Sequence, residues 1–192
     1  SLKPTIMRKN LGAKPLSYPQ PVFIIAAYGA DGVPSAMNAA WAGITNHTEI
    51  TMCLDRRHKT VEVLRSRGAF TVSMGTAPQV VACDYVGIVS GHKVPDKFAR
   101  AGFHATPSES VDAPLIDELP LALECRLISY DEERELLTGE IVNVSADECI
   151  LDERGKVNPH ALRPIVFDPF NNTYLEIEHE VGKAFKDGAQ LK

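Results

Sequence analysis

The segment Arg57-His58-Lys59-Thr60 is the strongest candidate for a binding site in this sequence. It lies between a predicted strand that ends near Leu54 and a predicted helix over 61–67. Arginine and lysine side chains, a threonine hydroxyl and the free amides of a helix N-terminus are the groups that bind a phosphate. Positive charge opposes the helix macrodipole at this end, and a bound anion would relieve that conflict. The segment therefore predicts a phosphate site, with a solvated basic turn as the alternative.

A second candidate runs from Ser90-Gly91-His92-Lys93 to Asp96-Lys97-Phe98. It combines a hydroxyl, a flexible glycine backbone and two lysines next to a short predicted helix. The same residues are also typical of an exposed loop, so alone this segment leaves both interpretations open.

A third candidate is the run of small residues from Ser35 to Ala42, which holds Asn38 and the only tryptophan, Trp41. Small side chains on a strand allow a flat ligand to approach the backbone closely, and Asn38 adds a polar group. The alternative is a tightly packed core strand.

Other standard chemistry has no support in the sequence. The glycine-rich fingerprints of Rossmann and P-loop proteins, the paired histidines of zinc hydrolases and the nucleophile elbow are all absent. The four cysteines and six histidines are scattered, so no metal site is expected.

Composition excludes further classes. The chain has 192 residues, with 20 Lys and Arg against 25 Asp and Glu, and this acidic balance argues against a nucleic-acid-binding protein. The longest apolar run, 22–28, is far shorter than the roughly 20 residues that span a bilayer. Without a recognisable secretory leader, we expect reduced cysteines and a cytoplasmic location.

The hydrophobic pattern predicts mostly strands, arranged in hairpins. Strands are expected at 22–28, 35–42, 49–54, 69–74, 121–130 and 136–144. Helices are expected at 61–67 with Thr60 as N-cap, at about 78–86, at 97–101 with Asp96 as N-cap, and near 181–185. This pattern suits an antiparallel barrel closed on itself, with short helices over its openings.

Together, and in this order and spacing, the three candidate segments resemble the flavin reductase-like family, and the flavoredoxins within it most closely. Further similar segments are Asn10–Lys14, Tyr18–Val22, Val111–Pro114, Leu121–Cys125, Gly139–Val142 and Gly182–Phe185. The resemblance covers nearly the whole chain.

The resemblance implies a single domain over 1–192 with a split β-barrel fold, including an N-terminal extension at 1–16 and a C-terminal tail from about 175. It further implies bound FMN and a homodimer with the flavin near the subunit interface, where the tail would lie. Carried over by position, the residues that face the isoalloxazine are Asn38, Ala39, Ala40 and Trp41. Those that hold the phosphate are Arg57, His58, Lys59 and Thr60, helped by Ser90, Gly91 and Lys97.

The function implied is NAD(P)H-dependent reduction of flavin, with electrons passed to a flavin or protein acceptor and no catalytic side chain. The alternatives are a flavoredoxin-type electron carrier with tightly bound FMN and no NAD(P)H site of its own, and a non-catalytic flavin-binding module. The chain departs from the family pattern at Asn46–Glu49, which is expected to border the ring, and at His92-Lys93.

Overall fold

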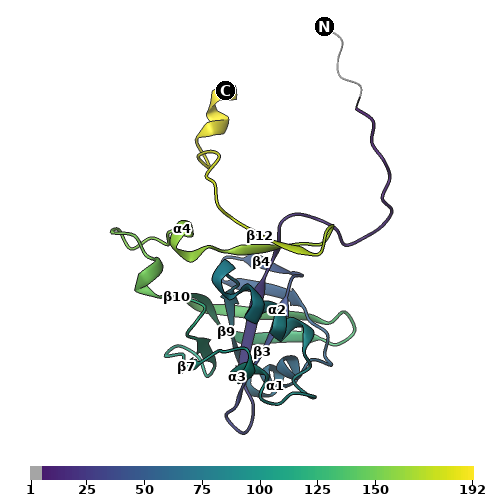
Figure 1. The fold of residues 1–192 in the computed structure, drawn as a ribbon, viewed down its shortest axis with the longest axis vertical. Helices are drawn as coiled ribbons and strands as arrows, with labels where there is room; N and C mark the ends of the chain where they lie inside the picture. Colours follow the sequence, from purple (N-terminus) through teal and green to yellow (C-terminus); the bar gives the residue numbers. More distant parts are fainter. Residues whose placement is uncertain (1–5) are drawn as a thin grey trace.

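The computed structural model describes residues 6–192, and a seven-stranded antiparallel sheet forms its body (Figure 1). The strand order is β3-β2-β6-β9-β10-β5-β4. The strands are β2 (Phe23–Tyr28), β3 (Pro34–Ala39), β4 (Ala42–Asn46), β5 (Glu49–Cys53), β6 (Ala69–Met74), β9 (Leu121–Asp131) and β10 (Leu136–Ala146). The predicted mainly β fold of the split-barrel type is confirmed. The split lies between the edge strands β3 and β4, which follow each other in the chain and do not pair within the described residues.

Two register shifts help the sheet to curl. They lie in the pairing of β9 with β10, after Thr138 and after Ile141. Such irregularities increase the local twist and bend the strand that carries them. Gly139 lies beside the first shift, where a Cβ atom would come within 2.5 Å of Phe70 Cζ, so the aromatic ring fills the space inside the bend.

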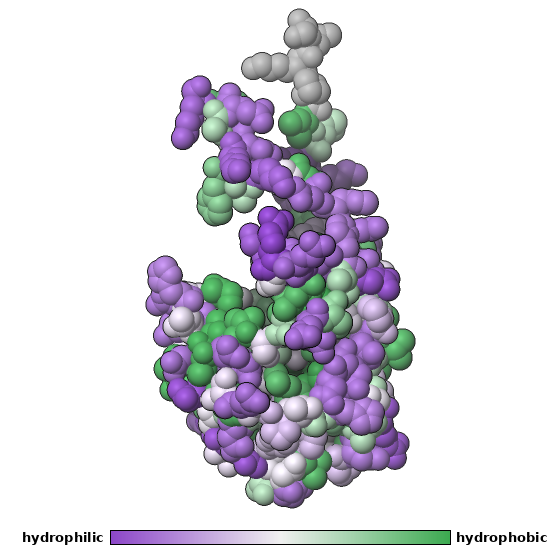
Figure 2. All heavy atoms as spheres, turned by 90° about the vertical axis from the view of Figure 1, so that its left-hand side faces the viewer, coloured by the Kyte–Doolittle hydropathy of each residue, from purple (hydrophilic) through white to green (hydrophobic). Residues whose placement is uncertain are grey.

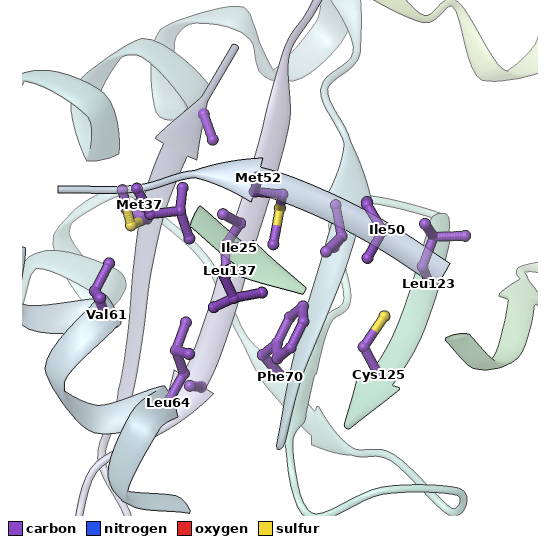
Figure 3. Packing of buried hydrophobic residues seen from close by; sticks show 14 of the residues in the cluster. Ile25, Met37, Ile50, Met52, Val61, Leu64, Phe70, Leu123, Cys125 and Leu137 are labelled. Atoms are coloured by element: carbon purple, nitrogen blue, oxygen red, sulfur yellow. The ribbon is translucent and has the colours of Figure 1, made fainter. Parts of the chain in front are cut away.

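The inside of the curl is a hydrophobic core closed by α1 (Lys59–Arg67) (Figure 3). Val61 and Leu64 on the inner face of α1 pack into the cluster that contains Phe70. Strand β2 is buried on both faces, which explains its continuous apolar sequence: Ile24, Ile25, Ala26 and Ala27 are all inaccessible to solvent.

The second face of β2 is covered by η1 (Ala77–Gln79), α2 (Val80–Ile88) and α3 (Lys97–Arg100). Alongside them lies the small hairpin of β7 (Ala105–Pro107) and β8 (Pro114–Ile116). Ala82, Cys83 and Val86 form the buried side of α2.

A second sheet has the order β1-β11-β12 and joins both ends of the chain. Its strands are β1 (Gln20–Pro21), β11 (Ile165–Asp168) and β12 (Thr173–Glu176), and η2 (Glu148–Ile150) and α4 (Pro159–Leu162) lie between β10 and β11 in the chain. The Tyr18 hydroxyl donates to Asp168 at 2.7 Å, and the Tyr174 hydroxyl donates to Asp84 on α2. Beyond this sheet the two ends of the chain project from the body, the C-terminal one ending in η3 (Asp187–Leu191) (Figure 1).

Three local predictions are wrong and a fourth is correct in part. The first helix begins at Lys59 with His58 at the N-cap, because the Thr60 hydroxyl is buried against Ser35 Oγ at 2.8 Å. The predicted strand 35–42 is interrupted after Ala39. Asp96 is the N-cap residue of α3 as predicted, but its side chain pairs with Arg100 and makes no capping bond. The helix expected at 181–185 is absent, and a 3₁₀ turn forms later, at η3.

Candidate functional site

The segments predicted to hold a phosphate meet around one cavity of about 340 Å³, which we call the phosphate cavity. It lies between the N-terminus of α1 and the loop that follows α2. All seven predicted phosphate residues line it: Arg57, His58, Lys59, Thr60, Ser90, Gly91 and Lys97. The fold thus brings together residues that are up to 40 positions apart in the chain.

The N-terminus of α1 offers free donors to this cavity. The first amides of a helix have no intrahelical partner, and no side chain caps this end. Gly91 lies against Lys59: a Cβ atom at position 91 would come within 2.9 Å of the Lys59 Cβ atom. Only a glycine therefore fits at position 91 without displacing Lys59.

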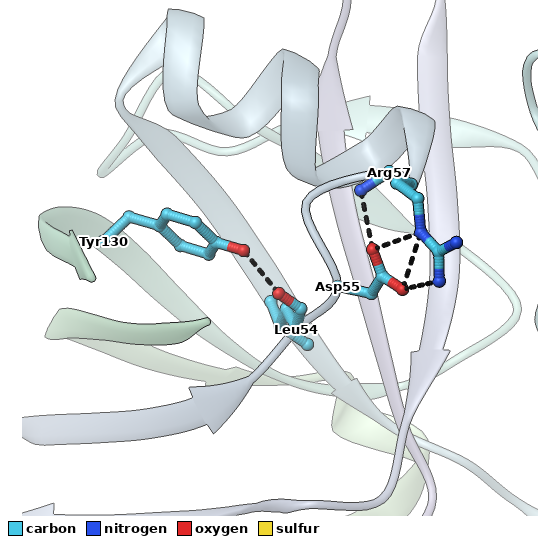
Figure 4. A network of polar contacts seen from close by, with 4 residues as sticks. All are labelled: Leu54, Asp55, Arg57 and Tyr130. Carbon is cyan, nitrogen blue, oxygen red and sulfur yellow. Dashed lines mark hydrogen bonds and ion pairs between the residues drawn. The ribbon is translucent and has the colours of Figure 1, made fainter. Parts of the chain in front are cut away.

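The turn between β5 and α1 is held by two sets of hydrogen bonds (Figure 4). Asp55 accepts from the Arg57 amide at 2.9 Å and from the Arg57 guanidinium at 2.6 Å, and Tyr130 donates to the Leu54 carbonyl at 2.6 Å. The Arg57 bonds hold the pKa of Asp55 well below its usual range. Asp55 neutralises part of the Arg57 charge, so the direct role of Arg57 at a phosphate stays a prediction.

Lys97 has an unusual position at the same cavity. Its side chain is buried, and Nζ donates to the carbonyls of Val86 at 2.8 Å and Val89 at 2.9 Å. These carbonyls belong to the C-terminal end of α2 and the residue after it, where a cation is favourable. Burial lowers the pKa of Lys97 to about 8. Lys97 thus shapes the loop that carries Ser90 and Gly91 and adds a positive charge beneath it.

A second cavity, of about 420 Å³, is lined by all four residues predicted to face a flat ring, and we call it the ring cavity. Ala39 ends β3, while Ala40 and Trp41 form the link to β4. The Trp41 carbonyl accepts from the Cys53 amide at 2.9 Å, which holds this link against β5. Asn38 donates through Nδ2 to the Cys83 carbonyl at 3.0 Å, so its amide group is committed to α2.

The two cavities share a wall, because Met37, Asp55 and His58 line both. Desolvation lowers the pKa of His58, so that its imidazole is mainly neutral at pH 7. A ligand with a phosphate at one end and a planar ring at the other can therefore extend from one cavity to the next. Each volume lies within the range of about 300–1,000 Å³ that small-molecule sites occupy.

Sequence reasoning missed several residues of the ring cavity. Gln20, Glu135 and Phe167 come from distant segments and line it together with Cys53 and Leu54. Gln20 lies in Tyr18–Val22, one of the segments that resemble the family, but neither its residue type nor its spacing indicated a role at the site. The loop Asn46–Glu49, which was expected to border the ring, is the β4–β5 hairpin turn and lines neither cavity.

Residues 6–192 contain neither a group of metal-binding side chains nor a membrane-spanning helix. Among residues 6–192, no three His, Cys, Asp or Glu side chains are grouped to hold a metal ion. No helix in the same range is long and apolar enough to cross a membrane. His92, a departure from the family pattern, lies near Glu62 at 3.5 Å, beside the phosphate cavity.

Comparison with known proteins gives a consistent result. Residues 16–167 match the model of the flavin reductase like domain family. The fold is similar to the flavoredoxin of Desulfovibrio vulgaris (Miyazaki F), with 38% identity and a TM-score of 0.90 over 95% of this chain and 100% of that one. It is also similar to the flavoredoxin of Methanosarcina acetivorans, with 27% identity and a TM-score of 0.84 over 98% and 100% of the two chains.

One curated relative matches only in part. An uncharacterized protein of Aquifex aeolicus is 31% identical over 83 residues, which are 41% of this chain and 42% of that protein. The match thus spans less than half of the length of this relative.

The phosphate cavity yields a first prediction. We expect Lys59→Ala/Thr60→Ala to weaken FMN binding by at least about 100-fold, since two hydrogen bonds to a charged group contribute roughly 1.5–3 kcal/mol each. Fluorescence titration with FMN measures this. Ser66→Ala, an exposed position on the same helix that lines neither cavity, is the control. An unchanged FMN affinity in the folded double variant would show that the phosphate lies elsewhere.

Lys97 yields a pH dependence. Its pKa of about 8 means that the ammonium charge is lost as the pH rises through that value. FMN affinity should therefore fall by up to about tenfold between pH 7 and pH 9. Riboflavin, which lacks the phosphate, and the variant Lys97→Met should show no such fall. A pH profile that persists in Lys97→Met would assign the titration to another group.

Proposed function

Since this chain belongs to the flavin reductase like family, we propose that it is an FMN-binding oxidoreductase that uses NAD(P)H to reduce flavin and passes electrons to a flavin or protein acceptor. The observation that supports this most directly is the pair of joined cavities. One presents cations and helix amides, and the other presents small side chains beside a tryptophan. FMN combines a phosphate with a planar ring, which is the chemistry that these cavities fit.

The residues of the phosphate cavity select for FMN over riboflavin. Lys59, the amides at the start of α1 and the loop held by Lys97 supply positive charge and donors. The only carboxylate on the lining, Asp55, is offset by Arg57. The cavity therefore stays favourable for an anion although the whole chain has a net charge of -5.

The ring cavity positions the reactive group. The residues of the ring cavity would hold the isoalloxazine of FMN, which when bound would supply the two-electron chemistry that links NAD(P)H to the acceptor. Backbone amides near Asn38–Trp41 would stabilise the negative charge that develops on the ring. Hydride transfer to the ring does not require a side chain to act as an acid or a base.

An electron carrier of the flavoredoxin type is the second candidate function. The similarity to flavoredoxins, at 38% identity for the Desulfovibrio protein, favours it. Such a carrier would hold FMN tightly and receive its electrons from a protein partner. A non-catalytic module that only binds flavin is the remaining alternative.

We also propose a homodimer in which the projecting C-terminal tail packs against the partner subunit. Val181 and Phe185 in the C-terminal tail are 98% and 108% exposed, so they contact nothing in their own chain. On α2, Val81 and Ile88 are 80% and 75% exposed and lie two turns apart on one side. Figure 2 shows hydrophobic residues gathered on the upper body, below the projecting ends. A second copy offers both surfaces a complementary apolar partner.

The four cysteines support a cytoplasmic location. All four are free thiols, and Cys83 and Cys125 are buried in the core. Burial raises the pKa of both thiols, to about 11 and about 12, so they are packing groups and not reactive nucleophiles.

A spectrum of the purified protein tests the proposed function. After addition of FMN and desalting, we expect retained flavin absorption bands, and we expect NADH or NADPH to bleach them under anaerobic conditions. Retained FMN without bleaching by either nucleotide would favour the carrier. If the protein retains no FMN and also shows no FMN-dependent oxidation of NAD(P)H, the proposal is overturned. Lys59→Ala/Thr60→Ala is the matched protein with a damaged phosphate cavity.

Sedimentation analysis tests the homodimer. Val181→Ser/Phe185→Ser should convert dimers to monomers without loss of folding, because neither side chain packs on its own body. Gln190→Ala, an exposed polar substitution in the same tail, should leave the dimer intact. A monomeric wild-type chain, or an equally dimeric double variant, would contradict the proposal.

A further inference from the structure

Gln20, at the start of β1, carries a buried polar atom that the fold leaves unsatisfied. Its side chain is 6% exposed, and Oε1 has no hydrogen-bond partner among residues 6–192. Leaving a buried acceptor unpaired costs roughly 1–3 kcal/mol, so such atoms are uncommon unless a ligand or partner completes them.

The unsatisfied atom is an acceptor because the other end of the amide is already used. Nε2 donates to the Pro15 carbonyl at 2.9 Å. Exchanging the two ends would place Oε1 against the Pro15 carbonyl, oxygen against oxygen, and lose that bond. The group missing from this structure is therefore a hydrogen-bond donor.

The position of Gln20 indicates where that donor comes from. Gln20 pairs with Phe167 across β1 and β11, and both residues line the ring cavity. The other buried side-chain oxygen without a partner in residues 6–192, Ser73 Oγ, lines neither cavity. Gln20 Oε1 is closed to solvent in this structure, so a small rotation of the amide that keeps the Nε2 bond to Pro15 must turn the oxygen toward a ligand in the ring cavity.

We propose that Gln20 recognises the flavin ring by accepting a hydrogen bond from its N3–H group. This rests on the proposed FMN function and adds the residue that orients the ring. The oxidised isoalloxazine has several acceptors along its polar edge, namely N1, N5 and two carbonyl oxygens, but a single donor, N3–H. An unpaired acceptor on the wall of the cavity matches that one position and repels the others.

Gln20 is thereby a specificity-determining residue for the orientation of the ring. The polar pyrimidine edge faces the β1–β11 sheet, and the opposite edge points away from it. Because the bond is made to a neutral group, its contribution does not depend on the phosphate cavity. The two contributions can therefore be measured separately.

The test compares FMN with 3-methyl-FMN, in which a methyl group replaces the N3 hydrogen. The wild-type chain should bind FMN about tenfold more tightly than the methylated analogue, as expected for one hydrogen bond to an otherwise unpaired buried acceptor. Gln20→Met keeps the volume and removes the acceptor, so it should bind both flavins with nearly equal affinity. Gln79→Met, on η1 and outside both cavities, should behave as wild type.

The outcomes separate this inference from the proposed function. If the wild-type chain binds neither flavin, the FMN function itself fails. If FMN binds but is preferred over 3-methyl-FMN equally by wild type and Gln20→Met, the methyl group acts by its bulk and the role of Gln20 is wrong. Equal binding of the two flavins by the wild type also overturns it.

Discussion

The turn from β5 into α1 is the constraint on which the rest of the site depends. Within the turn, Asp55 accepts hydrogen bonds from the amide and the guanidinium of Arg57. On the other side, the Leu54 carbonyl accepts from the Tyr130 hydroxyl, and the Leu54 amide donates to the Glu135 carbonyl. Because this turn forms the boundary between the two cavities, its geometry determines where both ends of a ligand can lie. The start of α1 and the link between β3 and β4 are thereby held at a fixed separation.

The site also solves an electrostatic problem in an acidic chain. Its positive groups are held in different ways: Lys59 on the rim, helix amides in the wall, and Lys97 buried beneath the loop. The buried cation is stabilised by backbone carbonyls and not by a carboxylate, so it is not neutralised by a counter-charge. The carbonyls of Val86 and Val89 hold the loop through Lys97 without cancelling its charge, so the net charge of the cavity stays positive.

Residues that are close in sequence could be predicted, and residues joined only by the fold could not. Residue type and spacing singled out Arg57–Thr60 as a candidate segment, whereas Ser90, Gly91 and Lys97 were added to it only through the resemblance to the family. Threonine is a residue type that often caps helices, but the Thr60 hydroxyl forms a hydrogen bond with Ser35 and the helix begins one residue earlier, at Lys59. Gln20 and Phe167 meet because β1 pairs with β11, a contact between opposite ends of the chain that no local pattern announces. The break after Ala39 has no glycine or proline to mark it.

The free edges of the main sheet have a consequence for how copies of this chain can assemble. Edge strands are templates onto which further strands can add without limit, which is the route to fibres. Here the edge strand β4 carries a register shift between Ile44 and Asn46 that interrupts its regular hydrogen-bonding row. Strand addition at the β4 edge is therefore disfavoured, which lowers the tendency of the chain to form fibres through this edge.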